Sequence, residues 1–262
     1  MIPELFHAGP FHLRSYGVMM AIAFLVGTWL GLREARRLSL DEDKLVNVIL
    51  LTLVASILGA RALYVIEHLA EFRREWGDVF ALWQGGLTLY GGIVAGTLVG
   101  LGSARRMGLP RWVVADALTP SLALGTMFGR VGCFLNGCCY GRPTTLPWGV
   151  HFPPGSFATL EFGDTPVHPS QLYNAGAGLV MFAALWALRR RFRTPGVMFW
   201  SFIAVFALAR IGIDLTRTYE ADAMILRGPV PLTESQVTSI ALALFGVLMI
   251  LRLRREAASA TA

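Results

Sequence analysis

Seven stretches of mostly apolar residues follow one another along the chain, separated by short polar segments. Each stretch holds 16 to 22 residues, close to the ~20 helical residues that cross the hydrocarbon core of a bilayer. The sequence therefore predicts an all-α polytopic membrane protein. Its seven transmembrane helices are expected at residues 15–32, 45–66, 87–103, 112–128, 170–188, 197–215 and 236–251.

The composition agrees with this prediction. The 262 residues are 55% hydrophobic and 15% charged, with a mean hydropathy of +0.56, whereas globular domains carry about 25% charged residues. Seven spans leave no room for a separate soluble domain. Residues 1–262 are therefore expected to form a single integral-membrane domain.

The positive charge follows the spans. Of the 23 basic residues, 14 lie in four short blocks at residues 33–44, 105–111, 189–193 and 252–255. These blocks follow the first, third, fifth and seventh spans, as the positive-inside rule requires of cytoplasmic ends. The sequence thus predicts an N-terminus outside and a C-terminus in the cytoplasm, and the net charge of +6 gives no reason to expect nucleic-acid binding.

Two longer segments are then expected on the outer side. Residues 68–84 place Phe72, Trp76, Phe80 and Trp83 at helical spacing, which suits either an amphipathic arm helix in the membrane interface or a loop with aromatic belt residues. Residues 140–167 are rich in Pro and Gly. They predict an outward loop able to cover a site, without regular structure.

The most informative segment is residues 129–141, where Arg130 stands among several glycines, including Gly132 and Gly141. An arginine costs about 3 kcal/mol at the centre of a membrane helix and less near its end, so it marks a functional site by default. Glycines remove side chains where a polar ligand group approaches the backbone. The segment predicts a site for an anionic group at the membrane edge.

Arg61 and Arg210 also lie within predicted spans. With Arg130, all three fall in the outer half of the bundle under the predicted topology. Guanidinium groups suit bidentate contact with phosphate. The alternative is that these arginines serve as structural ion pairs with Asp214, Glu67 and Asp116.

Other polar groups are expected on the same side. They include Tyr16 in the first span, Tyr90 before Gly91-Gly92 in the third, Asn136, and His168 and Gln171 at the start of the fifth. The three cysteines, Cys133, Cys138 and Cys139, have a spacing that matches no usual zinc or iron–sulfur framework. Packing or a local disulfide is favoured over direct chemistry or metal binding, and no metal is predicted.

At these residues the chain resembles the bacterial prolipoprotein diacylglyceryl transferases along nearly its whole length. The glycine–arginine signature and the His-Pro-Ser-Gln-Leu-Tyr segment are its specific parts. The resemblance rests on Tyr16-Gly17, Gly59-Ala60-Arg61, Gly91-Gly92, Gly129-Arg130-x-Gly132-x-Phe134-x-Asn136-Gly137, His168-Pro169-Ser170-Gln171-Leu172-Tyr173, and Arg210 with Asp214.

The resemblance implies an enzyme of the bacterial inner membrane, with its active site toward the outer face. It would transfer a diacylglyceryl group from phosphatidylglycerol to the lipobox cysteine thiol of a preprolipoprotein, forming a thioether and releasing glycerol phosphate without a cofactor. Arg130 would hold the lipid headgroup and Arg210 would assist the leaving phosphate. The substrate pocket would also include Asn136, Tyr16, Arg61, Gly132, Gly141 and Gln171.

The chain departs from the family at four positions. Tyr90 stands where well-studied members carry His, Cys138 and Asn174 replace carboxylates, and Phe206 replaces a tyrosine. The usual base candidate is therefore missing, so His168 becomes the preferred base or proton relay, with Tyr90 as a weaker candidate because its ordinary pKa is near 10. Two alternatives remain: a membrane transferase for another lipid or acceptor, and a non-catalytic lipid-binding paralogue.

Overall fold

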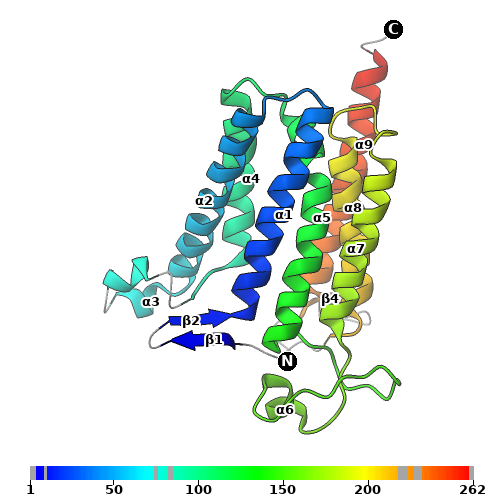
Figure 1. The fold of residues 1–262 in the computed structure, drawn as a ribbon. Helices are drawn as coiled ribbons and strands as arrows, with labels where there is room; N and C mark the ends of the chain where they lie inside the picture. The colour runs from blue at the N-terminus through cyan, green and yellow to red at the C-terminus, as the bar shows by residue number, and fades with distance from the viewer. Residues whose placement is uncertain are drawn as a thin grey trace. The chain divides into compact units, whose positions relative to one another are not determined.

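The computed structural model describes residues 4–8, 11–73, 76–81, 85–217, 224–226 and 232–259. The chain divides into two compact units. Unit 1 comprises Met1–Gly31 and Leu118–Ala262, and unit 2 comprises Leu32–Ala117. Helices α1 and α5 each contribute to both units (Figure 1).

Long helices occupy all seven predicted spans. Six of them, all except α4, are long and apolar enough to cross a membrane, which supports a polytopic membrane protein. Helix α4 ends in Arg105-Arg106, which makes it less apolar, and its crossing of the membrane stays a prediction. The seven helices are α1 (Ser15–Arg37), α2 (Glu42–Glu67), α4 (Leu89–Arg106), α5 (Arg111–Asn136), α7 (Ser170–Leu188), α8 (Val197–Asp214) and α9 (Glu234–Ser259).

Several helices extend beyond the predicted spans. The largest functional consequence is in α5, which continues past residue 128 to Asn136. Arg130 was expected at the edge of its span but lies within the helix. Hydropathy locates the apolar part of a helix, whereas the backbone hydrogen bonds continue into polar turns.

Short elements complete the fold. β1 (Glu4–Ala8) pairs with β2 (Phe11–Arg14), and β3 (Met224–Leu226) pairs with β4 (Leu232–Thr233), both antiparallel. The sequence analysis predicted none of these strands. Local capping groups set some helix starts: Asp41 Oδ1 accepts a hydrogen bond from the Lys44 amide at 3.1 Å before α2, as an N-cap residue does.

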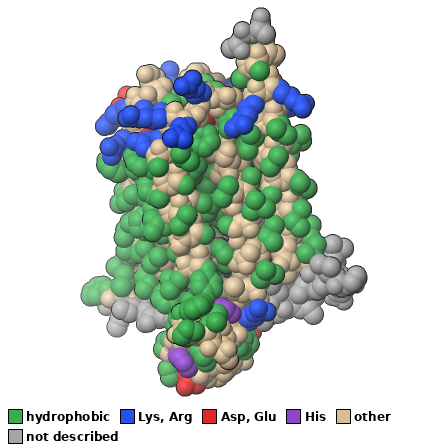
Figure 2. Space-filling view, turned by 90° about the vertical axis from the view of Figure 1, so that its right-hand side faces the viewer, with side chains coloured by type: hydrophobic (Ala, Val, Ile, Leu, Met, Phe, Trp, Pro, Cys, Tyr) green, Lys and Arg blue, Asp and Glu red, His purple; other side chains and the backbone are tan. Residues whose placement is uncertain are grey.

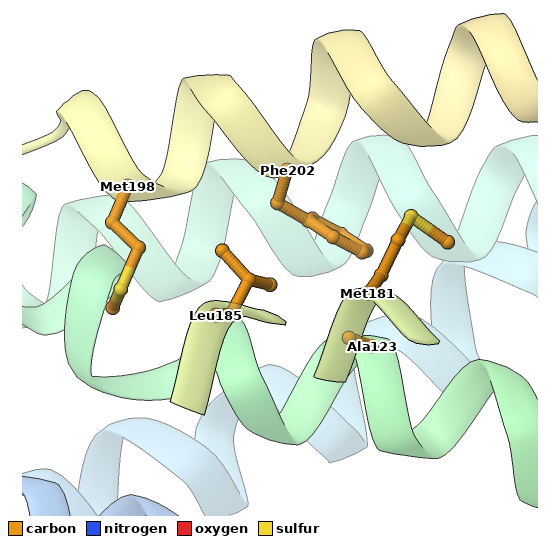
Figure 3. Close-up of a cluster of buried hydrophobic side chains, with 5 residues drawn as sticks. All are labelled: Ala123, Met181, Leu185, Met198 and Phe202. Carbon is orange, nitrogen blue, oxygen red and sulfur yellow. The ribbon is translucent and has the colours of Figure 1, made fainter. Parts of the chain in front are cut away.

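A buried cluster joins three helices of unit 1. Ala123 comes from α5, Met181 and Leu185 from α7, and Met198 and Phe202 from α8 (Figure 3). Gly178 lets α7 approach α5, since a Cβ there would lie 3.0 Å from the Ala123 carbonyl oxygen. Small residues allow such close contact between membrane helices. Hydrophobic side chains cover much of the outside of the helices (Figure 2).

In unit 2 the contact between α2 and α4 depends on glycine. A Cβ on Gly59 would lie 2.6 Å from the Gly91 carbonyl oxygen and would also collide with Ala95, while a Cβ on Gly91 would collide with Gly59. The Gly91-Gly92 pair therefore allows the backbones of α2 and α4 to pack closely within unit 2.

We expect Gly59→Ala to lower the thermal unfolding midpoint in detergent, because overpacking of a tight contact costs about 1–3 kcal/mol. Gly102→Ala is the matched control, since Gly102 lies on α4 with nothing within 4 Å of an added Cβ. This control should leave the midpoint unchanged or raise it. Equal midpoints for the two variants would contradict the close contact.

Arg61 anchors the segment that follows α2. Its side chain is buried, at 6% exposure, and its Nε donates to the Val79 carbonyl at 2.9 Å. Its Nη1 donates to the Gly85 and Gly86 carbonyls at 2.8 and 3.0 Å, and its Nη2 donates to the Asp78 carbonyl.

The segment at 68–84 contains two short helices in its described part, α3 (Leu69–Phe72) and η1 (Trp76–Phe80). The two helices are separated by residues 73–75, of which the structure describes Arg73 alone, so the arm helix over 68–84 stays a prediction. Phe72 is buried, whereas Trp76 and Phe80 are exposed. The predicted position of Trp83 lies outside the described residues.

The segment at 140–167, which was predicted as an outward loop, is more ordered than expected. It contains α6 (Phe157–Phe162), and Val167 forms isolated bridges with Pro143 and Val150. Phe152, Ala158 and Val167 form a small buried core of their own. The sequence showed no periodic pattern here because these apolar side chains meet through turns and not along one element.

Candidate functional site

Five helix ends of unit 1 meet where most predicted site residues lie. The starts of α1, α7 and α9 and the ends of α5 and α8 lie at the same end of this unit as α6 (Figure 1). Tyr16, Arg130, Gln171 and Arg210 belong to these ends. The sequence analysis expected this gathering on one side, and within unit 1 the structure agrees.

Arg130 is half-buried in α5. Its guanidinium makes no hydrogen bond or ion pair with another residue in the described part of the chain. Its electrostatic neighbours include Tyr16 and Cys139. A cation this far from bulk water, with its donors unused, has its full bidentate capacity available for an anion.

Gly132 lies beside Tyr16. A Cβ on Gly132 would lie 3.1 Å from ring atom Cδ2 of Tyr16 and 3.2 Å from Cβ of Met19. Gly132 thus lets α5 approach α1, and Tyr16 keeps 40% of its surface exposed. The predicted pocket role of Tyr16 fits this placement. Gly132 is explained by the close packing of α5 against α1.

After Asn136 the chain leaves α5 through a tight turn. Gly137 and Cys139 have φ angles of +75° and +63°, a region that glycine adopts easily and cysteine rarely. Gln171 holds this turn, because its Nε2 donates to the Cys138 carbonyl at 2.8 Å. Gln171 is fully buried, and its Oε1 has no hydrogen-bond partner among the described residues.

Backbone hydrogen bonds connect the next residues to α7 and α8. The Gly141 amide donates to the His168 carbonyl at 2.9 Å, and the Arg142 amide donates to the Thr216 carbonyl at 2.9 Å. A Cβ on Gly141 would lie 2.7 Å from Cβ of His168 and would collide with Ser170 and Thr216. Gly141 therefore allows the close approach that positions His168.

His168 belongs to a short chain of polar rings. Its Nδ1 lies 3.2 Å from the Tyr173 hydroxyl, which accepts a hydrogen bond from Trp148 Nε1 at 2.7 Å. Burial lowers the pKa of His168, and the nearby Arg142 guanidinium lowers it further. The imidazole is therefore neutral near pH 7. When Nδ1–H donates to Tyr173, Nε2 keeps a free lone pair and can accept a proton.

Arg210 differs from Arg130 because it is already paired. Its Nε lies 3.0 Å from Asp214 Oδ1 and donates to Ser235 Oγ at 3.1 Å. The side chains of Arg210 and Asp214 are 14% and 0% exposed. The ion pair lies within α8, and the hydrogen bond to Ser235 joins the end of α8 to the start of α9, which favours the structural alternative for Arg210.

Two predicted site residues belong to unit 2. Tyr90 is the second residue of α4 and is 46% exposed. Arg61 uses its guanidinium on four backbone carbonyls of the same unit. The structure thus gives Arg61 a structural role, and its predicted contact with substrate has no support from these bonds.

Two of the departures from the family pattern are accounted for by interior packing. Asn174 is 4% exposed, and its Nδ2 donates to the Ser170 carbonyl at 2.9 Å. Phe206 packs against the buried cluster of unit 1. Both side chains are thus used in interior contacts of unit 1.

The sequence analysis gave no role to Thr216 and Tyr173. Ser170 Oγ lies 2.7 Å from Thr216 Oγ1 and connects the start of α7 with the end of α8. Tyr173 orients His168. Tyr173 was visible in a specific segment, whereas nothing in residue spacing indicated Thr216, which is 46 positions from its partner.

Taken together, the fold and the site define a polytopic membrane protein with an arginine-centred polar site at one end of its helices. Residues 3–252 match the family model for prolipoprotein diacylglyceryl transferase. The chain belongs to this family.

The relatives cover nearly the whole chain. A phosphatidylglycerol–prolipoprotein diacylglyceryl transferase of Geobacter sulfurreducens is 35% identical over 258 residues, covering 97% of this chain and 96% of the relative. Enzymes of the same name from Trichormus variabilis and Rhizobium leguminosarum are 34% and 33% identical. The match to the Trichormus enzyme covers 94% of this chain and 88% of that enzyme. The match to the Rhizobium enzyme covers 98% of this chain and 93% of that enzyme.

Proposed function

We propose that this chain transfers a diacylglyceryl group from phosphatidylglycerol to the lipobox cysteine thiol of preprolipoproteins. The family and the named activity of its relatives support this reaction. The observation that carries it is the half-buried Arg130, whose donors are unused among the described residues. It lies beside Tyr16 in a site that can receive a lipid phosphate.

The chemistry needs stabilisation of one leaving group and activation of one nucleophile. The thiol sulfur forms a bond to the glyceryl carbon, and the carbon–oxygen bond breaks as glycerol phosphate takes the electron pair. Arg130 stabilises the charge on the phosphate, with Arg210 as a second cation nearby in the same unit. Asn136 and Tyr16 line the pocket.

The acceptor thiol must become a thiolate, because the thiolate is the nucleophile. His168 is the proposed base, since its imidazole is neutral and held by Tyr173. Tyr90 is the weaker candidate. Both assignments remain proposals about residues that the structure places in different units.

The proposed orientation follows the basic blocks. Seven helices, including α4, cross the bacterial cytoplasmic membrane with the N-terminus outside, so that the end carrying Arg130 and α6 faces outward. Phosphatidylglycerol then reaches the site from the bilayer. Exposed Trp76 and Phe80 suit contact of the arm with the membrane interface.

The test is an assay of the purified protein in detergent. A lipobox peptide and phosphatidylglycerol should give a thioether-linked diacylglyceryl peptide and glycerol phosphate, both measured by mass spectrometry. Phosphatidylethanolamine serves as the control lipid. Transfer from the control lipid at an equal rate would favour a broader transferase. Tight binding of phosphatidylglycerol without product would favour a lipid-binding paralogue.

The pH dependence tests His168. A general base works only when neutral, so kcat/KM should fall as pH decreases through an apparent pKa below the ordinary value of 6.5, because burial and Arg142 disfavour the imidazolium. His168→Gln should lower the rate by about 10²- to 10⁴-fold and remove this acid limb. Arg142→Gln should move the limb toward higher pH. An unchanged acid limb in His168→Gln would exclude His168 as the titrating base.

A further inference from the structure

The three cysteines of the chain lie together at the end of α5. Cys133 is in the last turn of the helix, and Cys138 and Cys139 follow in the turn after Asn136. Their Sγ atoms all lie within 4.8 Å of one another. The Cys138 amide donates to the Cys133 carbonyl at 3.1 Å, which brings the turn back toward the helix.

We propose that Cys133, Cys138 and Cys139 bind one thiophilic divalent cation of the Zn²⁺ type, in a site that goes beyond the proposed transfer reaction. Zinc–sulfur bonds of about 2.3 Å place the thiolates of one ion about 3.8 Å apart. The limit of 4.8 Å on the Sγ separations lies about 1 Å above this value, so the sulfurs must approach one another by no more than about 1 Å to bind one ion.

A cation accounts for this cluster better than a disulfide does. A disulfide uses two sulfurs and leaves the third thiol alone, and adjacent cysteines such as Cys138 and Cys139 rarely pair with each other. A Zn²⁺ ion uses all three as thiolates. All three side chains are half-buried, so the ion is partly shielded while one side stays open.

The surroundings of the cluster suit a bound ion. Three thiolates and one divalent cation carry a net charge of −1, and Arg130 and Arg217 are electrostatic neighbours of Cys139. Gln171 fixes the Cys138 carbonyl, as outer groups fix the ligands of metal sites. Its buried Oε1 lacks a partner among the described residues.

Three protein ligands leave the fourth position of zinc open. A thiol is the ligand that this position favours, and the acceptor of the proposed reaction is a thiol. When its sulfur binds the ion, the thiol proton passes to His168, the proposed base, and no bond of the lipid changes. This step, which rests on the proposed function, would supply the thiolate in a chain that lacks the usual histidine at position 90.

Metal binding is tested first, without any activity assay. Untagged protein in detergent is stripped with a chelator and titrated with Zn²⁺, and with Co²⁺ as a spectroscopic probe. We expect one Zn²⁺ per chain, a thiolate-to-cobalt absorption band, and protection of the cysteines from maleimide in the wild-type protein. Cys138→Ser and Cys139→Ser should each weaken binding at least about 10-fold.

The control variant is His151→Ala, which removes an exposed histidine paired with Asp164 and should keep full binding. Thiols that react fully with maleimide in the presence of Zn²⁺, or a disulfide found by mass spectrometry, would overturn the site. Because protection is measured on the wild type, a variant that misfolds does not decide the result.

Transfer activity on the same preparations separates the two proposals. Stoichiometric Zn²⁺ without product in any condition would keep the metal site and remove the proposed function. Full turnover by the metal-free protein would overturn the binding of the acceptor thiol at the open position. Turnover restored only by Zn²⁺ would support both.

Discussion

Arg130→Ala should lower kcat/KM for diacylglyceryl transfer by about 10²- to 10³-fold, the loss seen when one charge-stabilising donor group is removed from a transition state. The reason is the unused guanidinium in α5, which offers a planar fork for a phosphate at a half-buried position. The folded state should be retained, because among the described residues this side chain has no hydrogen-bond or ion-pair partner to lose. Product formation and thermal unfolding are measured side by side.

Arg130→Lys separates charge from geometry. Lysine keeps the positive charge but loses the bidentate fork, so we expect a smaller but clear loss of activity. Arg191→Ala is the matched control, since Arg191 is an exposed arginine beyond the other end of α7. Near-normal transfer by Arg130→Ala would show that the headgroup binds elsewhere.

Asp214→Ala should cost the largest amount of stability, about 3–5 kcal/mol, because it removes the carboxylate that pairs with the largely buried Arg210 cation within α8. The two side chains are 3.0 Å apart, and that of Asp214 is fully buried. Asp164→Ala is the control, since its carboxylate is 92% exposed and pairs with His151. Removing this pair should change the unfolding free energy by less than about 0.5 kcal/mol. Denaturant unfolding in mixed micelles gives both values.

A double variant shows whether the loss comes from the unpaired charge. Arg210→Met combined with Asp214→Leu removes both ions and fills the space, so it should be more stable than Asp214→Ala alone. The single variants Arg210→Met and Asp214→Leu complete the cycle. A loss of stability in the double variant that equals the sum of these two single losses would contradict the ion pair. Its transfer activity reports independently on the role of Arg210 toward the phosphate.

The sequence was sufficient for the helices because a membrane span has a strong and simple signal. A run of about 20 apolar residues matches the length of a membrane-spanning helix, and a helix satisfies its own backbone hydrogen bonds within the bilayer. The 170–188 span matches α7 at both ends. The end of α5 was missed because glycine and arginine lower the hydropathy without breaking the helix. Arg130 was therefore expected at the edge of the span, whereas it lies six residues before the last residue of α5, Asn136.

The candidate site was predicted as a set of residue types but not as a set of contacts. Hydropathy marks Arg61, Arg130 and Arg210 alike, since each is a cation within or at the end of an apolar stretch. Only the structure separates them. Arg61 is bound to backbone carbonyls and Arg210 to a carboxylate, whereas Arg130 is available to a ligand. Partner choice depends on long-range geometry that spacing along the chain does not contain.

The sequence allowed a local disulfide among the cysteines but did not predict that all three sulfurs lie together. A four-residue gap followed by a pair has no counterpart among usual ligand spacings. The left-handed backbone at Gly137 and Cys139 brings the sulfurs together, and such turns follow from local backbone geometry and not from periodicity. The same limit applies to Thr216, whose hydroxyl reaches Ser170 across two helix ends.

Arg61 holds its neighbours through the carbonyls of residues 78, 79, 85 and 86. At residues 78 and 79 any amino acid supplies the same carbonyl. Residues 85 and 86 are glycines with positive φ, and a Cβ on Gly86 would collide with Arg61 and Tyr64. The attachment of the segment therefore tolerates substitution at residues 78 and 79 but requires glycine at residue 86.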